Sequence, residues 1–164
     1  MLRLIIILTV GFQTIGLGQN FTGQVFMLTE YYLDEKCEVN AECDCCSTDL
    51  FFLTDKEFAM VNRCLFNDSY YRGTYSVKAN GLTLTFKQKV VNEIINEETN
   101  KIKNQTKKVE IKPYKFSIGK CDSKIRLQHA TIKDFKNGSR YSVTREKELT
   151  KELKGTQAWK LVSE

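Results

Sequence analysis

The chain has 164 residues, 41% of them hydrophobic, which is enough for one domain with a buried core. The net charge of +5 is modest, and the lysines and arginines are spread singly along the chain, with Lys107-Lys108 as one short run. This distribution favours a solvated surface over nucleic-acid binding, because it provides no Lys/Arg-rich helix or cluster.

The N-terminus predicts a secretory signal peptide. Arg3 precedes an apolar run over residues 4–12, and small residues at Gly16 and Gly18 suit a cleavage before Gln19. The run is too short to cross a bilayer, which takes about 20 residues. We therefore expect a signal peptide over residues 1–18 and a single domain over 19–164. The mature protein is expected to be exported, periplasmic or secreted, with no integral membrane segment.

The first half of the mature chain predicts β-strands. An apolar and aromatic stretch over 22–33 predicts the first strand, and an acidic loop follows over 34–44. The runs 48–53 and 58–66 predict a hairpin. Asn80-Gly81 is typical of a tight hairpin turn, and the residues after it alternate cleanly between apolar and polar.

The second half predicts further strands and one helix. The polar stretch 92–108 is interpreted as a long hairpin tip or a mobile loop, and Pro113 interrupts the strand pattern after it. A capped helix is predicted over 144–153 and a last strand over 158–162. These eight or nine strands predict an all-β fold, a lipocalin-like antiparallel barrel of about eight strands with one short C-terminal helix.

The six cysteines allow two interpretations. In an oxidising compartment an even number of cysteines favours disulfides, and spacing favours Cys46–Cys64, with Cys121 reaching Cys37 or Cys45. Alternatively, the cluster holds a soft metal, copper or zinc, because thiolates and imidazole suit those ions. The candidate metal ligands are Cys43, Cys45, Cys46, Cys64 and His129.

The sequence does not predict an enzyme. It contains one histidine and lacks the nucleophile-elbow, zincin and phosphate-loop motifs. The acids around the cysteine cluster raise thiol pKa values, which disfavours a thiolate nucleophile. His129 is in phase with Ile125 and Leu127, so we expect it to point inward.

An eight-stranded barrel has room for core side chains or one small ligand. The candidate lining residues are aromatic: Tyr75, Phe86, Tyr114, Phe116 and Trp159. The same residues would also serve simply to fill the core.

The middle of the chain resembles the NlpE-like envelope proteins of bacteria. The resemblance rests on short motifs within residues 43–86: Cys43-x-x-Cys46, the segment 55–58, Gly73-Thr74-Tyr75 and Leu82-Thr83-Leu84. It implies a small lipocalin-like barrel, an association with copper tolerance and envelope stress, and Cys43 and Cys46 as the matching metal or redox pair.

Together these observations predict a non-enzymatic binding or sensing module. In the main hypothesis its cysteine-rich loop binds a soft metal or forms a redox-responsive disulfide. In the alternative hypothesis the barrel carries a small apolar ligand and the disulfides are purely structural.

Overall fold

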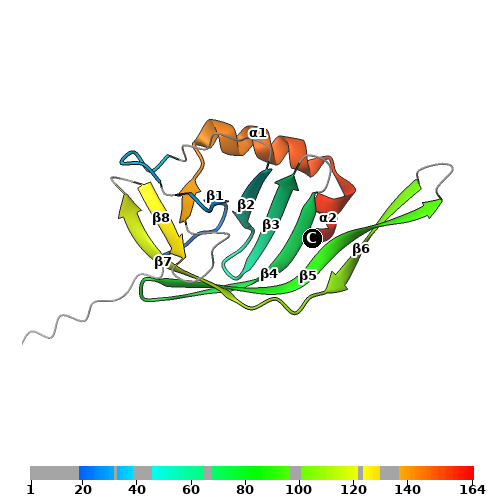
Figure 1. The fold of residues 1–164 in the computed structure, drawn as a ribbon, viewed down its shortest axis with the longest axis horizontal. Coiled ribbons are helices and arrows are strands. Elements are labelled where there is room, and N and C mark those ends of the chain that lie inside the picture. Colours follow the sequence, from blue (N-terminus) through cyan, green and yellow to red (C-terminus); the bar gives the residue numbers. More distant parts are fainter. Residues whose placement is uncertain are drawn as a thin grey trace, which may run out of the picture.

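The computed structural model describes residues 19–31, 33–38, 46–64, 68–96, 101–121, 124–129 and 137–164, with the backbone alone at Cys46 and at 92–96, 101 and 102. Within these ranges the chain forms nine strands and two helices (Figure 1). The strands are β1 (Val25–Thr29), β2 (Cys46–Phe52), β3 (Glu57–Cys64), β4 (Ser69–Lys78), β5 (Gly81–Asn96), β6 (Lys101–Lys108), β7 (Tyr114–Cys121), β8 (Lys124–His129) and β9 (Asn137–Arg140). The helices are α1 (Val143–Lys154) and α2 (Gln157–Ser163).

Eight of the strands close into an antiparallel barrel. The order is β4-β3-β2-β1-β9-β8-β7-β5, and the additional pairing of β4 with β5 completes the ring. Closure removes the free edges that an open sheet would expose. The predicted all-β barrel of about eight strands is therefore confirmed. The Asn80-Gly81 hairpin is also present, since Lys78 pairs with Gly81.

Alternate residues of the strands fill the barrel. Because successive side chains of a strand point to opposite faces, one residue in two is interior. The buried interior cluster is formed by Phe21, Phe26, Leu28, Leu50, Phe52, Phe58, Met60, Tyr75, Leu82, Leu84, Phe86, Phe116 and Leu127. This is the apolar pattern that the sequence shows most clearly in 82–87.

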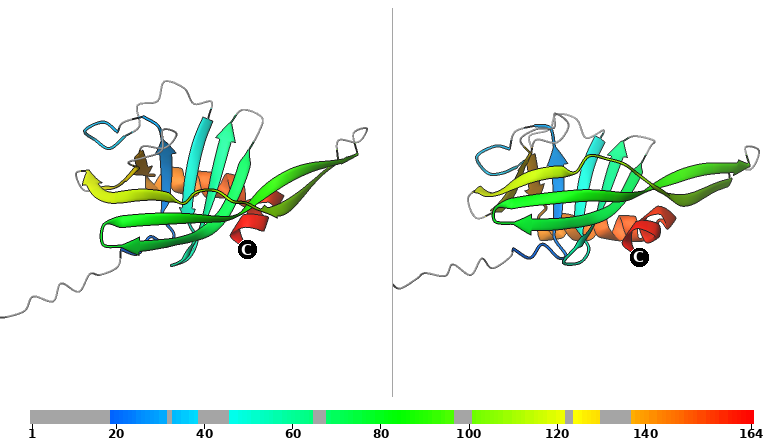
Figure 2. Two further views of the ribbon diagram at one scale, coloured as in Figure 1. Left: turned by 60° about the horizontal axis from the view of Figure 1, so that its bottom comes forward. Right: turned by 90° about the horizontal axis from the view of Figure 1, so that it is seen from below.

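Both helices cover the outer face of the barrel (Figure 2). Leu149 and Leu153 of α1 pack with Phe51, Ala59 and Val61, which alternate with the interior residues of β2 and β3. The helix predicted over 144–153 is confirmed, and its N-cap is Ser142, whose side chain accepts a hydrogen bond from the Arg145 N–H.

The strand predicted over 158–162 is wrong, because this segment is α2. Thr156 caps the helix by accepting a hydrogen bond from the Trp159 N–H. Ala158, Trp159 and Val162 then share the face that is buried against the barrel wall. A short apolar run fits either a strand or a buried helix face, so periodicity could not distinguish the two.

A long hairpin extends from the barrel wall. The second half of β5 pairs with β6, and the two strands project beyond the barrel in every view (Figures 1 and 2). β6 pairs with no other described strand, and residues 109–113, including Pro113, separate it from β7. The described part of the polar stretch 92–108 is thus hairpin arm, and residues 97–100 lie outside the described residues.

The chain after β1 is fixed to the outside of the barrel by a disulfide. Cys37 is bonded to Cys121 at the end of β7, across 84 residues of sequence. The Ser139 hydroxyl donates a 2.7 Å hydrogen bond to the Cys37 carbonyl, and the Asn137 side-chain amide donates one of 2.7 Å to the Tyr31 carbonyl. Ser139 and Asn137 alternate with the inward-facing Gly138, so this loop covers the outer face of β9.

Candidate ligand-binding site

The cysteine cluster does not form a metal centre in the part of the chain that the structure describes. Cys43 and Cys45 lie outside the described residues, and Cys64 is disulfide-bonded. A sulfur in a disulfide is not a thiolate ligand, so Cys64 does not fill its predicted metal role here. No group of three or more histidine, cysteine, aspartate or glutamate residues within the described ranges could hold a metal ion.

The structure tests both predicted disulfide pairings to different extents. Of the two partners left open for Cys121, the structure has Cys37. Cys64 stands directly opposite Cys46 in the pairing of β2 with β3. This register places the two Cα atoms in a cross-strand pair, the arrangement on which the Cys46–Cys64 prediction depends.

His129 lies among aromatic rings. Its side chain is 5% exposed, and its ring centroid lies 4.9 Å from that of Phe116 and 6.0 Å from that of Tyr114. The Nε2 atom accepts a 3.3 Å hydrogen bond from the Lys115 backbone N–H. Burial lowers the pKa of His129 below its ordinary value, because the cation is desolvated. His129 is therefore a neutral member of the barrel interior.

A row of aromatic rings crosses the barrel from His129 to β4. Tyr114 lies 4.8 Å from Phe86, and Phe86 lies 5.8 Å from Tyr71, measured between ring centroids. Phe58 lies 5.3 Å from Phe86 on the core side of the row. All these contacts are edge-to-face, the geometry that aromatic quadrupoles favour.

The two ends of the barrel differ. We call the end at which β1, β3 and β8 finish the His129 end, and the opposite end the Phe21 end. At the Phe21 end, Phe21 is fully buried against Phe26 and Phe52, and the Tyr75 hydroxyl donates to the Thr54 carbonyl at 2.9 Å. At the His129 end, the rings of Tyr71 and Tyr114 pack on the core but are only partly buried. The interior aromatic surface therefore reaches solvent at the His129 end.

The predicted lining residues divide into three groups. Tyr75, Phe86 and Phe116 belong to the buried interior, and Tyr114 lies at the edge of it. Trp159 is wrong as a lining residue. It lies on α2, outside the barrel, with its ring centroid 4.8 Å from that of Phe51. The error follows from the strand wrongly predicted over 158–162.

Two polar residues at the His129 end were not predicted as site residues from the sequence. The ammonium of Lys89 lies 5.4 Å from the centroid of the Tyr71 ring. Asn62, in phase with the interior residues Phe58 and Met60, has a buried Oδ1 with no hydrogen-bond partner in the structure. Asn62 was recognisable from its phase. Lys89 was not, because a register shift at Arg72/Gly73 reverses which residues of β5 face inward.

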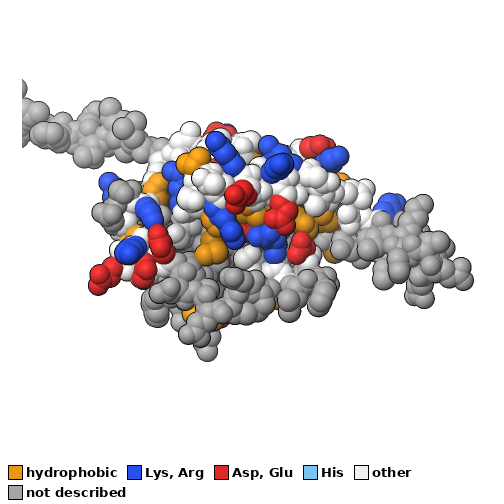
Figure 3. Space-filling view, turned by 90° about the horizontal axis from the view of Figure 1, so that it is seen from above, with side chains coloured by type: hydrophobic (Ala, Val, Ile, Leu, Met, Phe, Trp, Pro, Cys, Tyr) orange, Lys and Arg blue, Asp and Glu red, His pale blue; other side chains and the backbone are white. Residues whose placement is uncertain are grey.

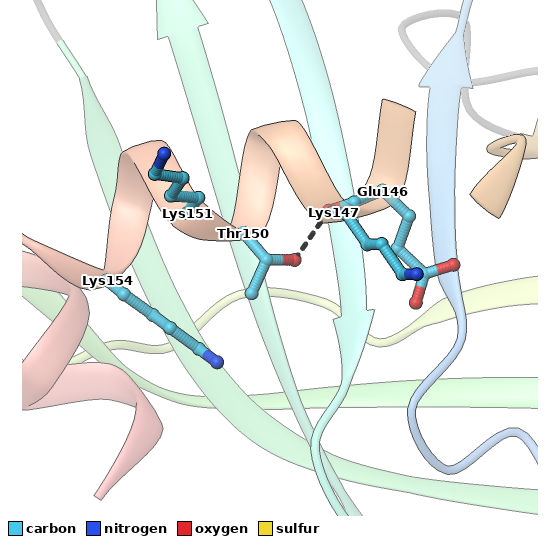
Figure 4. A pocket seen from close by; sticks show the side chains of 5 residues that line it. All are labelled: Glu146, Lys147, Thr150, Lys151 and Lys154. Carbon is cyan, nitrogen blue, oxygen red and sulfur yellow. Dashed lines mark hydrogen bonds between the residues drawn. The ribbon is translucent and has the colours of Figure 1, made fainter. Parts of the chain in front are cut away.

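A hollow on the outer surface is a weaker candidate for a ligand site than the His129 end. It measures about 380 Å³, and its described lining residues all belong to α1: Glu146, Lys147, Thr150, Lys151 and Lys154 (Figure 4). The Lys151 ammonium points away from those of Lys147 and Lys154, and the Thr150 hydroxyl donates to the Glu146 carbonyl at 2.7 Å. Basic and acidic side chains are mixed over this face (Figure 3). The hollow thus lacks converging groups.

The comparisons with known proteins address the fold. No family model matches the chain, and no curated protein matches it. The crystal structure of a streptavidin-like protein from Bacteroides eggerthii DSM 20697 is similar, with a TM-score of 0.53 and 11% sequence identity over 80% of this chain and 88% of that one. At this identity the likeness shows a shared barrel fold. The NlpE-like identity finds no support in these comparisons.

In the described ranges, neither α1 nor α2 is long and apolar enough to span a bilayer.

Proposed function

We propose that the protein is a non-enzymatic binding protein that takes a small, largely apolar ligand at the His129 end of its barrel. The observation that carries this proposal is the aromatic row. Phe86, in the middle of the row, is buried in the core, and its neighbours Tyr71 and Tyr114 are partly exposed. Aromatic surface with a few polar groups is the usual lining of small-ligand sites.

The polar groups at this end support the same proposal. Asn62 carries a buried acceptor with no partner, and burying such a group costs free energy that a ligand donor would recover. The likeness to a streptavidin-like protein gives a fold in which a closed barrel can enclose one small ligand. The copper or zinc hypothesis has no comparable support, because three of the six cysteines, Cys37, Cys64 and Cys121, are disulfide-bonded.

Binding of N-phenylnaphthylamine, an uncharged apolar probe that fluoresces in apolar sites, tests the proposal. We expect saturable 1:1 binding that weakens about tenfold in Tyr114→Ala, since a truncated contact aromatic costs on the order of 1–2 kcal/mol. Val143→Ala is the control, because Val143 is 61% exposed and lies at the start of α1, outside the barrel.

The result that would overturn the proposal is either an absence of saturable binding or an equal loss in Tyr114→Ala and Val143→Ala. Intrinsic fluorescence of the single tryptophan serves as an internal check. Trp159 packs between α2 and the outer wall, so its emission, recorded before probe is added, should report the folded state of each variant.

A further inference from the structure

We propose that the ligand is a small organic anion, an apolar body with a carboxylate or similar group, and that Lys89 and Lys107 bind its charge. This inference rests on the proposed function and adds the chemical class of the ligand. It starts from the strand register. Lys89 on β5 is the direct cross-strand partner of Lys107 on β6, so both side chains stand on the same face of the hairpin.

That face continues the barrel interior. Tyr71 on β4 packs against the interior cluster, and its cross-strand partner is Lys89 on β5. The Lys89 ammonium lies over the Tyr71 ring, 5.4 Å from its centroid. The aromatic row of the His129 end therefore terminates in a pair of lysines, with apolar surface on one side and positive charge on the other.

Among the side chains that the structure describes, no acidic group is paired with either lysine. Like charges placed directly opposite each other in an antiparallel pair are destabilising. Within the described residues, the ion pairs join Arg63 to Asp49 and Glu152, Arg72 to Glu57, and Lys124 to Glu38, and none includes Lys89 or Lys107. Burial lowers the pKa of His129, which disfavours a further positive charge in the row. An anion between the two ammonium groups would relieve their repulsion.

The partial burial of Lys89 also supports an anionic ligand. The exposed Lys107 and Lys108 can be solvated fully, but Lys89 is half-buried beside the aromatic rings. A cation in that position attracts an anionic group more strongly than a fully solvated one, because screening by water is reduced. An apolar ligand without charge would use the rings alone and leave the lysine pair uncompensated.

A pair of probes that differ in charge tests the inference. Anilinonaphthalene sulfonate carries a sulfonate on the N-phenylnaphthylamine skeleton, so the two probes share their apolar body. We expect the anionic probe to bind more tightly. Its affinity should fall about fivefold in Lys89→Gln and in Lys107→Gln, the effect of losing one partly screened ion pair, while the affinity of the neutral probe stays within twofold.

Lys108→Gln is the matched control. Lys108 neighbours Lys107 on β6 but pairs with Gln88, on the opposite face of the hairpin. An equal loss of sulfonate binding in all three variants would overturn the inference, because it would show a general effect of net charge. Saturable binding of both probes with equal affinity would overturn it too and leave the proposed function standing. Absence of binding by both probes would overturn both.

Discussion

Asp49 of β2 and Tyr141, which precedes α1, are joined by a hydrogen bond in which the tyrosine hydroxyl donates to Oδ1 of the carboxylate. Asp49 is fully buried on the outer face of β2, and the Arg63 Nε lies 3.3 Å from its other oxygen. Burial raises the pKa of Asp49, although Tyr141 and Arg63 both act in the opposite direction. Arg63 also contacts Glu152 at 3.2 Å, so this network ties the segment before α1 and the last turn of α1 to the barrel wall.

Removing the tyrosine hydroxyl should destabilise the fold. In Tyr141→Phe the buried carboxylate loses a donor, and an unsatisfied buried group costs about 1–3 kcal/mol of the free energy of unfolding. Denaturant titration measures this loss. Tyr31→Phe is the control, because Tyr31 is exposed and should change stability by less than about 0.5 kcal/mol. Equal stability of the two variants would show that the hydrogen bond contributes nothing.

The single histidine should titrate below its ordinary pKa. Burial lowers the pKa of His129, so the folded protein binds its proton less readily than the unfolded chain does. As the pH falls through about 6.5, the pKa of histidine in the unfolded chain, protonation of His129 therefore lowers the free energy of unfolding. Below the pKa of the folded state this decrease stops. Because the chain contains one histidine, its ring proton signal in an NMR titration gives the folded pKa directly.

His129→Phe tests the same linkage through stability. Phenylalanine keeps an aromatic ring against Tyr114 and Phe116 and removes the titrating group. The unfolding free energy of the wild-type protein should fall more steeply between pH 7 and pH 5 than that of the variant. Parallel pH profiles for the two proteins would contradict the assignment of this acid sensitivity to His129.

A glycine in β4 makes room for a core ring. A Cβ atom at Gly73 would lie 2.2 Å from the Thr85 carbonyl oxygen and 2.7 Å from Cε1 of Phe58. Gly73→Ala should therefore destabilise the protein by about 1–3 kcal/mol or more, the range for an overpacked core. Gly119→Ala is the control, because its Cβ would meet nothing closer than 4.0 Å. Thermal unfolding of both variants measures the difference, and equal midpoints would contradict the steric argument.

The barrel could be predicted from the sequence because its signals are local. The alternation over residues 82–87 and the Asn80-Gly81 turn specify strands and a hairpin without reference to the rest of the chain. The apolar run at 158–162 is too short for its periodicity to distinguish a strand from a helix, and the local helix signal is the capping residue Thr156 just before it. Packing against the barrel wall then buries the apolar face of this helix.

The candidate site was less predictable for a related physical reason. Phe86, Phe116 and Tyr114 could be found because each alternates with polar neighbours on its own strand. Lys89 could not, because the irregular pairing between Arg72 and Gly73 changes the inward face of β5 midway. A register shift of one residue is a property of two paired strands, and the sequence of one strand does not reveal it.

The Cys37–Cys121 disulfide should contribute strongly to stability. It closes a loop of 84 residues, for which chain-entropy models give about 4–5 kcal/mol, and measured losses for native disulfides are about 2–5 kcal/mol. The double variant Cys37→Ala/Cys121→Ala removes the bond without leaving a free thiol. We expect it to unfold at a lower denaturant concentration. A midpoint equal to that of the wild-type protein would mean that Ser139 and Asn137 hold the loop without the disulfide.

The partner of Cys64 is the remaining prediction, and we expect it to be Cys46. The register of β2 with β3 places the two residues directly opposite each other, and Cys64 is disulfide-bonded. Proteolysis of protein purified without reductant, followed by mass spectrometry of the linked peptides, identifies the pair. The linked peptides must be cut between Cys45 and Cys46 or fragmented there, because Cys43, Cys45 and Cys46 are close in sequence.

A bond from Cys64 to Cys43 or Cys45 would contradict the prediction. It would leave Cys46 without its cross-strand partner and reopen a role for that sulfur in metal binding. A Cys46–Cys64 bond would instead account for four of the six cysteines in two structural disulfides, together with Cys37–Cys121. Only Cys43 and Cys45 would then remain as thiol ligands, fewer than the four ligands that a structural zinc site uses. The barrel interior would then be favoured as the functional part of the molecule.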